Sequence, residues 1–187
     1  MSKFYYRVKQ KIFIGINIPS KAKKRLVSAM GKWQELPIKF TREDKLHLTV
    51  LFLGYLEEDL IPEICEKVKK ACENEDIFDV EFDSIGLAPS KEKPQMIWLQ
   101  GLPNENLLKI HEKLEKELGL FVAPKKSFRP HITLGRIRKF KWEVLDQQPE
   151  ISEKFQLIVT ADSIDVMSGN FEKGENEYTI LDSCQLK

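Results

Sequence analysis

The sequence predicts a single α+β domain, residues 1–187, that consists of two similar lobes with antiparallel sheets. Residues 11–54 match residues 95–138 at a constant offset of 84 positions, which is typical of two lobes related by a pseudo-twofold axis. Stretches with helix and strand periodicity are also mixed along the chain, and several strand-like stretches follow one another near its end. This second observation favours antiparallel sheets over a doubly wound parallel sheet.

The first half of the repeat begins with a strand and a helix. Isoleucines and a phenylalanine indicate a buried strand over residues 11–18. Ser20 is a residue type favoured at helix N-caps, and the apolar residues that follow it recur at helical spacing to about residue 33. A second strand is expected over residues 46–53, ended by Gly54.

The rest of the chain continues in the same mixed pattern. Hydrophobic periodicity distinguishes its helices from its strands, and Gly119 is expected to end the last helix. The predicted elements are a helix over 59–71, strands over 78–87 and 96–99, a helix over 104–118, and strands over 131–137, 155–159, 163–167 and 178–181.

Composition predicts a globular protein in a reducing compartment. The apolar fraction is 42 %, the charged fraction is 32 %, and no apolar run approaches the length of a membrane span. The first ten residues lack the apolar core of a signal peptide. The three cysteines are an odd number without metal-ligand spacing. We therefore expect a cytoplasmic protein with no membrane attachment.

A repeated pair of residues carries the strongest functional signal: His47 with Thr49, and His131 with Thr133. Residues two apart on a strand point to the same face, so each pair presents an imidazole beside a hydroxyl. Two imidazoles that face one pocket can supply a general base and a general acid near neutral pH. The two hydroxyls can hold an oxyanion between them. The pattern predicts phosphate-ester chemistry without a metal.

Each of these residues also has a structural interpretation. A single histidine in an apolar run is more often a packed structural residue, and the repetition is what favours function. A zinc site usually needs a third protein ligand, and no carboxylate or thiolate repeats beside the motifs. His111 has no repeated surroundings, so we assign it to packing or to the surface. Core packing is also expected for Phe52 and Trp98, although either can stack on a base.

The region around the second motif is strongly basic. No acidic residue occurs between residues 118 and 142, a stretch that contains Lys125, Lys126, Arg129, Arg136, Arg138, Lys139 and Lys141. Such a field attracts phosphates, although a solvated surface has the same composition. Arg129 shares the strand face of His131, whereas Arg136 needs a bulge or a strand end to reach that face. Both arginines are candidate phosphate contacts.

With both motifs in place, the chain resembles the 2H phosphoesterase superfamily, and most closely its RNA 2′,3′-cyclic phosphodiesterase branch, historically called 2′-5′ RNA ligases. The resemblance covers nearly the whole chain and rests on residues 12–19, 45–54, 97–99 and 128–137. Near the end, Ser168, Gly174 and Tyr178 are similar to a serine-to-tyrosine stretch of the branch. Residues 169–177 depart from that stretch, because they lack its leucine and proline.

This resemblance implies a bilobal α+β fold with helices outside and both motifs lining a central groove. It also implies a reaction without metal or cofactor, in which water opens a terminal 2′,3′-cyclic phosphate of RNA to a 2′-phosphomonoester. His47 would be the proton donor and His131 the proton acceptor, while Thr49 and Thr133 would bind the non-bridging oxygens. RNA ends that carry the cyclic phosphate are the implied partner, and no obligate protein partner is implied.

Three alternatives stay open from the sequence. The same residues can catalyse the reverse reaction, which joins RNA ends through a 2′-5′ linkage. A non-catalytic module can bind RNA ends with the groove and the basic stretch alone, although binding does not require two histidines. A phosphodiesterase for small cyclic nucleotides can use the same motifs.

Overall fold

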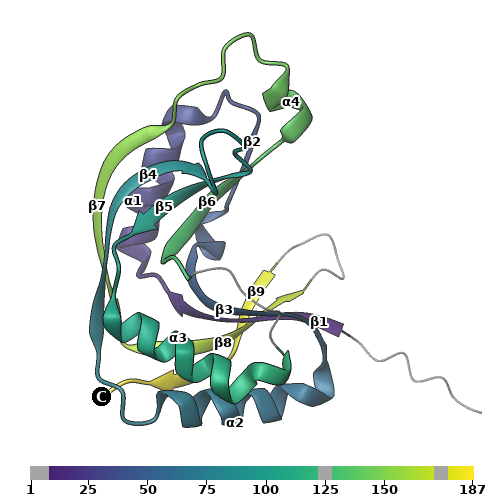
Figure 1. The fold of residues 1–187 in the computed structure, drawn as a ribbon, viewed down its shortest axis with the longest axis vertical. Coiled ribbons are helices and arrows are strands. Elements are labelled where there is room, and N and C mark those ends of the chain that lie inside the picture. The colour runs from purple at the N-terminus through teal and green to yellow at the C-terminus, as the bar shows by residue number, and fades with distance from the viewer. Residues whose placement is uncertain (1–8, 122–127, 171–176) are drawn as a thin grey trace, which may run out of the picture.

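The computed structural model describes residues 9–121, 128–170 and 177–187, and these form a mixed fold of helices and strands (Figure 1). In these ranges the strands are β1 (Lys9–Asn17), β2 (Ile38–Phe40), β3 (His47–Glu57), β4 (Phe78–Ala88), β5 (Met96–Gly101), β6 (His131–Ile137), β7 (Ser152–Ala161), β8 (Ser163–Asn170) and β9 (Glu177–Gln185). The helices are α1 (Ser20–Met30), α2 (Ile61–Cys72), α3 (Glu105–Leu118) and α4 (Lys139–Glu143).

All strands belong to one antiparallel sheet that has two halves. The order is β7-β4-β5-β6-β3-β1-β8-β9, and β2 pairs with β6 outside this path. The halves meet between β6 and β3, where the pairing is limited to Leu48 and Ile132. Figure 1 shows the strands of one half running across the direction of those in the other. The predicted α+β fold is therefore confirmed, with the two antiparallel lobes joined through a short pairing.

The long helices lie outside the sheet, and two of them, α1 and α3, cross from one half to the other. α1 follows β1 but lies against the other half, where the Arg25 guanidinium stands 5.3 Å from the Phe155 ring of β7. α3 follows β5 but packs beside α2 beneath β3, and the His111 ring bonds the Val50 carbonyl at 2.8 Å. α1 and α3 thus each connect one half of the sheet to the other.

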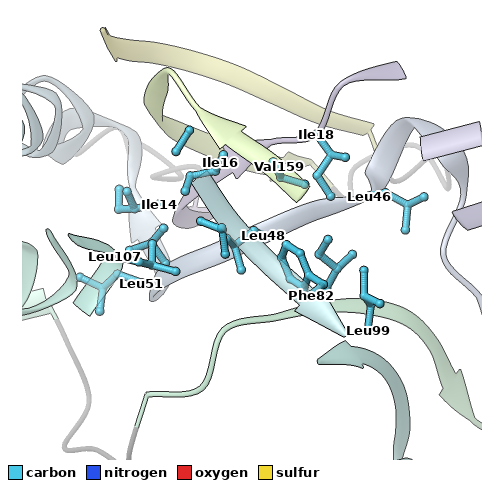
Figure 2. Packing of buried hydrophobic residues seen from close by; sticks show 14 of the residues in the cluster. Ile14, Ile16, Ile18, Leu46, Leu48, Leu51, Phe82, Leu99, Leu107 and Val159 are labelled. Carbon is cyan, nitrogen blue, oxygen red and sulfur yellow. The ribbon is translucent and has the colours of Figure 1, made fainter. Parts of the chain in front are cut away.

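A continuous hydrophobic cluster extends through both halves. Ile14 and Ile16 of β1 and Leu48 of β3 are almost fully buried in one half, and Leu99 and Phe82 are buried in the other. Figure 2 shows these side chains converging from strands far apart in the sequence. Alternation along each strand explains the pattern, because every second residue points to the same face. The opposite face of the central strands is therefore free to carry polar groups.

The strand pairing shows that the predicted internal repeat, with its constant offset of 84, is wrong by one residue along β1. His47 pairs with Asn17, and His131 pairs with Gln100, so the motif strands correspond at an offset of 84 and their partner strands at 83. The gap-free match from residue 11 is therefore one residue out along β1 and β5. The physical reason is alternation: an offset of 83 places buried Ile14 on buried Ile97.

Several predicted boundaries also move. Gly54 does not end the second strand, because β3 continues to Glu57 through a bulge at which Gly54 has a φ of 91°. Ser20 is the first helical residue of α1, and its side chain forms no cap. α3 does end at Leu118 with Gly119 as its C-cap, as predicted, although Gly119 has helical φ and ψ and begins a 3₁₀ turn. β2 and α4 were not predicted, because three to five residues are too few to show a period.

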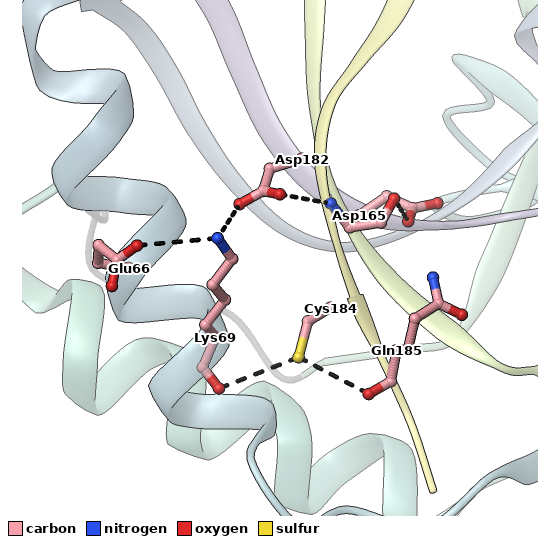
Figure 3. A network of polar contacts seen from close by, with 7 residues as sticks. Glu66, Lys69, Asp165, Asp182, Cys184 and Gln185 are labelled. Carbon is pink, nitrogen blue, oxygen red and sulfur yellow. Dashed lines mark hydrogen bonds and ion pairs between the residues drawn. The ribbon is translucent and has the colours of Figure 1, made fainter.

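A polar network joins α2 to the edge strand β9 (Figure 3). The Lys69 ammonium lies 3.0 Å from the Asp182 carboxylate and 3.7 Å from the Glu66 carboxylate of its own helix. Asp165 of β8 accepts a 2.7 Å hydrogen bond from the Ser183 hydroxyl. Each exposed ion pair contributes little to stability, because water and salt screen the charges. Together with the β8–β9 pairing, they hold in place the strand that carries Tyr178.

The cysteines and the helices bear on the expectations drawn from composition. Cys65, Cys72 and Cys184 are all free thiols. Within the described ranges, no helix combines the length and the apolar character that a membrane span requires.

Candidate active site

A groove with a volume of about 1040 Å³ opens where the two halves of the sheet meet. The structure brings all six predicted site residues to this groove, which is lined by His47, Thr49, Arg129, His131, Thr133 and Arg136. They come from β3, from β6 and from the residues just before β6. The single pairing between Leu48 and Ile132 places the starts of both motif strands side by side. The two histidines therefore enter one groove from opposite halves of the repeat.

Both histidine rings are held in the same orientation by the backbone. Nδ1 of His47 lies 2.8 Å from the carbonyl oxygen of Lys45, and Nδ1 of His131 lies 2.8 Å from that of Arg129. A carbonyl can only accept, so Nδ1 carries the hydrogen in each ring. The remaining nitrogen, Nε2, is the one that can accept or donate a proton.

The threonine hydroxyls lie beside the histidines, as alternation requires. Oγ1 of Thr49 is 2.9 Å from Nε2 of His47. Because Nδ1 carries the hydrogen in the neutral ring, Nε2 accepts this bond from the hydroxyl. Thr133 occupies the equivalent position beside His131 and also lines the groove. Both histidines and both threonines thus line one cavity, and the first pair is joined by a hydrogen bond.

A β-bulge brings Arg136 to the groove face. Thr133 pairs with Trp98, but Gly135 pairs with Ile97, so Leu134 is an extra residue in β6. The extra residue reverses the alternation and puts Arg136 on the face of His131 and Thr133. The same irregularity occurs in β3, where it directs Phe52 to the groove. Phe52 is thus the equivalent of Arg136 in the first half of the repeat.

The two histidines have different aromatic surroundings despite the repeat. The His131 ring stacks on Trp98 with centroids 3.7 Å apart and planes 21° apart. The His47 ring packs against Phe13 at 4.7 Å and meets Tyr178 edge-on at 5.2 Å. The repeat places Gly15 where the other half has Trp98.

Two glycines allow these contacts by leaving out a side chain. A Cβ atom on Gly15 would lie 2.9 Å from the Leu48 carbonyl oxygen and 3.6 Å from the His47 ring. A Cβ atom on Gly169 would lie 3.1 Å from the Tyr178 ring, which pairs with it across β8 and β9. Small residues at both positions therefore let His47 and Tyr178 lie against the sheet.

Burial makes both imidazoles hard to protonate in the unliganded protein. It lowers the pKa of His47 to about 4, because the bond to the Lys45 carbonyl only partly opposes desolvation and the positive charges of Lys11 and Lys23 add to it. The pKa of His131 is also lowered, again chiefly by burial. An imidazole whose pKa lies below its ordinary value of about 6.5 is neutral at pH 7. Both Nε2 atoms are therefore proton acceptors until an anion enters.

The groove attracts anions. Lys11, Lys45, Arg129 and Arg136 line it, and none of the lining residues in the described part of the chain is acidic. Desolvation and the nearby charge of Arg136 lower the pKa of Lys11, as expected among like charges. A phosphate entering the groove relieves this repulsion.

Several groove residues were missed from the sequence. The expected core positions of Phe52 and Trp98 are wrong, because both line the groove and Phe52 is 49 % exposed. Lys45 could have been found, since the offset of 84 places it on Arg129. His111 is confirmed as a packing residue: it is buried and stacks on Phe128 at 4.2 Å. It also forms part of the groove wall.

Some residues singled out in the sequence lie outside the part of the chain that the structure describes. Lys125 and Lys126 of the basic stretch lie outside the described residues, as does Gly174 with the rest of 171–176. In the described ranges, no three His, Cys, Asp or Glu side chains are grouped as metal ligands.

Comparison with known proteins identifies the family. The family model described as the 2′-5′ RNA ligase superfamily matches residues 19–170, which include both motifs. The chain belongs to the 2′-5′ RNA ligase superfamily. The sequence resemblance to this group is thereby confirmed.

Relatives within the 2′-5′ RNA ligase superfamily align over most of the chain. A Thermotoga maritima protein named RNA 2′,3′-cyclic phosphodiesterase is 27 % identical over 180 residues, covering 94 % of this chain and 95 % of the relative. A Bacillus subtilis protein of the same name is 26 % identical over 147 residues, covering 73 % and 74 %.

Solved structures share the fold. The TT0787 protein of Thermus thermophilus superimposes with a TM-score of 0.80 at 22 % identity, covering 94 % of this chain and 97 % of the other. E. coli LigT in complex with 3′-AMP superimposes with a TM-score of 0.76 at 20 % identity, covering 96 % and 99 %. These matches confirm the predicted α+β fold of this chain.

Proposed function

We propose that this protein hydrolyses the terminal 2′,3′-cyclic phosphate of RNA to a 2′-phosphomonoester by paired-histidine acid–base catalysis, without a metal ion. The observation that carries the proposal is the pair of imidazoles in one cationic groove, each with Nδ1 bonded to a backbone carbonyl so that Nε2 is the nitrogen left for proton transfer. The names of the Thermotoga maritima and Bacillus subtilis relatives support the choice of substrate.

In this mechanism the two histidines exchange protons with opposite ends of the reacting phosphate. Nε2 of His131 accepts a proton from the attacking water as its oxygen bonds to phosphorus. Nε2 of His47 donates a proton to the 3′ oxygen as the bond from phosphorus to that oxygen breaks. Proximity to the reacting atoms makes such transfers worth roughly 10²–10⁴ in rate. The product carries the phosphate on the 2′ oxygen.

The remaining groove residues stabilise the charge on phosphorus. The hydroxyls of Thr49 and Thr133 donate hydrogen bonds to the non-bridging oxygens, whose charge grows as the fifth bond forms. For Thr49, this requires the hydroxyl to leave Nε2 of His47, which frees that nitrogen to carry its own proton. Arg129 and Arg136 contribute positive charge from the β6 side.

The negative charge of the substrate favours uptake of a proton from solvent by His47, and catalysis needs that proton. His47 is neutral at pH 7 in the free protein because its pKa is about 4. A negative charge within about 4–6 Å favours the protonated form of an imidazole. Binding of the phosphate therefore raises the pKa of His47 and converts it into a proton donor.

The cytoplasmic location expected from the sequence stays a prediction.

The fate of a defined RNA end tests the proposal against its alternatives. A decamer ending in a 2′,3′-cyclic phosphate is incubated with the protein, EDTA and a 5′-hydroxyl acceptor RNA in ¹⁸O-labelled water. Hydrolysis gives a 2′-phosphate that contains one ¹⁸O atom, and this is the expected product. A joined RNA without ¹⁸O would indicate ligation instead, and bound but unchanged substrate would indicate a binding module. Activity that EDTA abolishes would contradict the metal-independent mechanism.

A further inference from the structure

A row of basic side chains continues the groove along β6. Lys39 of β2 pairs with Arg136, and directly paired residues in an antiparallel sheet share a face. Arg138 follows Arg136 by two residues in extended conformation, so it points to the same side. Lys39, Arg136 and Arg138 are all exposed. Positive charge on the groove face therefore extends toward α4.

α4 adds exposed apolar surface at the far end of this row. Phe140 is 83 % exposed and Val144, just after the helix, is 79 % exposed. Lys139 and Lys141 flank Phe140 and are exposed as well, although Lys139 lies 3.9 Å from the Glu143 carboxylate. Trp142 is buried and fixes the helix to the core. Phe140 thus contributes an aromatic ring that the fold itself does not use.

The position of α4 separates this surface from the catalytic histidines. β6 begins at His131 beside β3 and ends at Ile137, with α4 beyond that end (Figure 1). Six steps of about 3.3 Å along a strand span about 20 Å. A single nucleotide bound at the histidines fits within the groove and does not reach α4, whereas a polymer does.

We propose that Lys39, Arg138, Lys139, Phe140 and Lys141 form a track that binds the RNA strand on the 5′ side of its cyclic end. The inference rests on the proposed function and adds that the preferred substrate is an oligonucleotide rather than a cyclic mononucleotide. Charge complementarity favours a polyanion along the basic row. An exposed aromatic ring between cations is a platform on which an unpaired base stacks.

Comparison of two substrates tests the track. A Phe140→Ala variant is assayed with a cyclic-ended decamer and with 2′,3′-cyclic AMP. Stacking on an aromatic side chain contributes about 1–3 kcal/mol per base, so we expect KM and Kd for the decamer to rise roughly tenfold. The kinetics with 2′,3′-cyclic AMP should be unchanged. A Lys139→Ala/Lys141→Ala variant should also flatten the salt dependence of decamer binding by about 0.7 per lost phosphate contact.

Ile158→Ala provides the matched control, because Ile158 is an exposed apolar residue of β7 outside the groove. It should leave the kinetics of both substrates unchanged. The track is refuted if Phe140→Ala binds the decamer as tightly as wild type, or if it impairs both substrates equally. Failure of the proposed function has a different signature: the wild-type protein would open neither substrate, and decamer Kd would still test the track.

Discussion

His47→Ala and His131→Ala proteins are each expected to have a kcat on cyclic-ended RNA that is roughly 10²–10⁴-fold below that of the wild type. Each substitution removes the Nε2 atom that accepts or donates the proton. Binding should persist, because the cations of the groove and the threonine hydroxyls stay in place. Single-turnover rates and Kd measured on the same RNA separate the two effects.

The effects of the two histidine substitutions on kcat are expected to be coupled. Residues that act as a unit are strongly non-additive, so the double variant should be about as slow as either single variant. Circular dichroism and thermal unfolding check that the variants fold. Losses that multiply in the double variant, or a single variant with near wild-type kcat, would show that the imidazoles do not work as a pair.

Thr49→Val and Thr133→Val should each lower kcat by about 10²–10³, the cost of one donor to a developing oxyanion. Valine keeps the β-branched shape that suits the strand, so the change removes the hydroxyl and little else. Serine at either position should restore most of the activity. Steady-state kcat and KM with the cyclic-ended decamer measure the effect.

Thr160→Val is the control for these substitutions. Thr160 also lies on a strand, but its hydroxyl bonds the Asp79 carboxylate at 2.6 Å outside the groove. Its kcat should stay within a few-fold of wild type. If Thr49→Val and Thr133→Val raised KM alone, the hydroxyls would bind substrate and transition state equally and would not stabilise charge on phosphorus.

Sequence periodicity predicted where the long elements lie, because each buries one face, although β7 and β9 extend well beyond the predicted 155–159 and 178–181. β6 was predicted over its full length, and α3 differed by one residue, with Asn104 as its N-cap. The paths of α1 and α3 were not predictable in the same way. Their patterns showed an apolar face but not which half of the sheet that face covers.

The reactive groups of the site were predicted because they repeat. His47 and His131 belong to two matching motifs, and both residues line the groove. The bulges could not be located from composition, and they determine that Arg136 and Phe52 face the groove. An apolar residue on a strand has the same pattern in a core as in a groove wall, which is why Trp98 was misplaced.

The pH dependence of turnover tests the paired-histidine account most directly. The base must be neutral and limits the rate on the acid side, and the donor must be protonated and limits it on the alkaline side. We therefore expect kcat to follow a bell-shaped curve. The alkaline decline of kcat/KM reports the pKa of the donor in the free protein, and that of kcat reports its pKa in the complex. Because the pKa of His47 is about 4 in the free protein and bound phosphate raises it, the alkaline decline of kcat/KM should occur at lower pH than that of kcat. Rates that stay flat from about pH 5 to pH 9, across the range in which histidines titrate, would contradict the account.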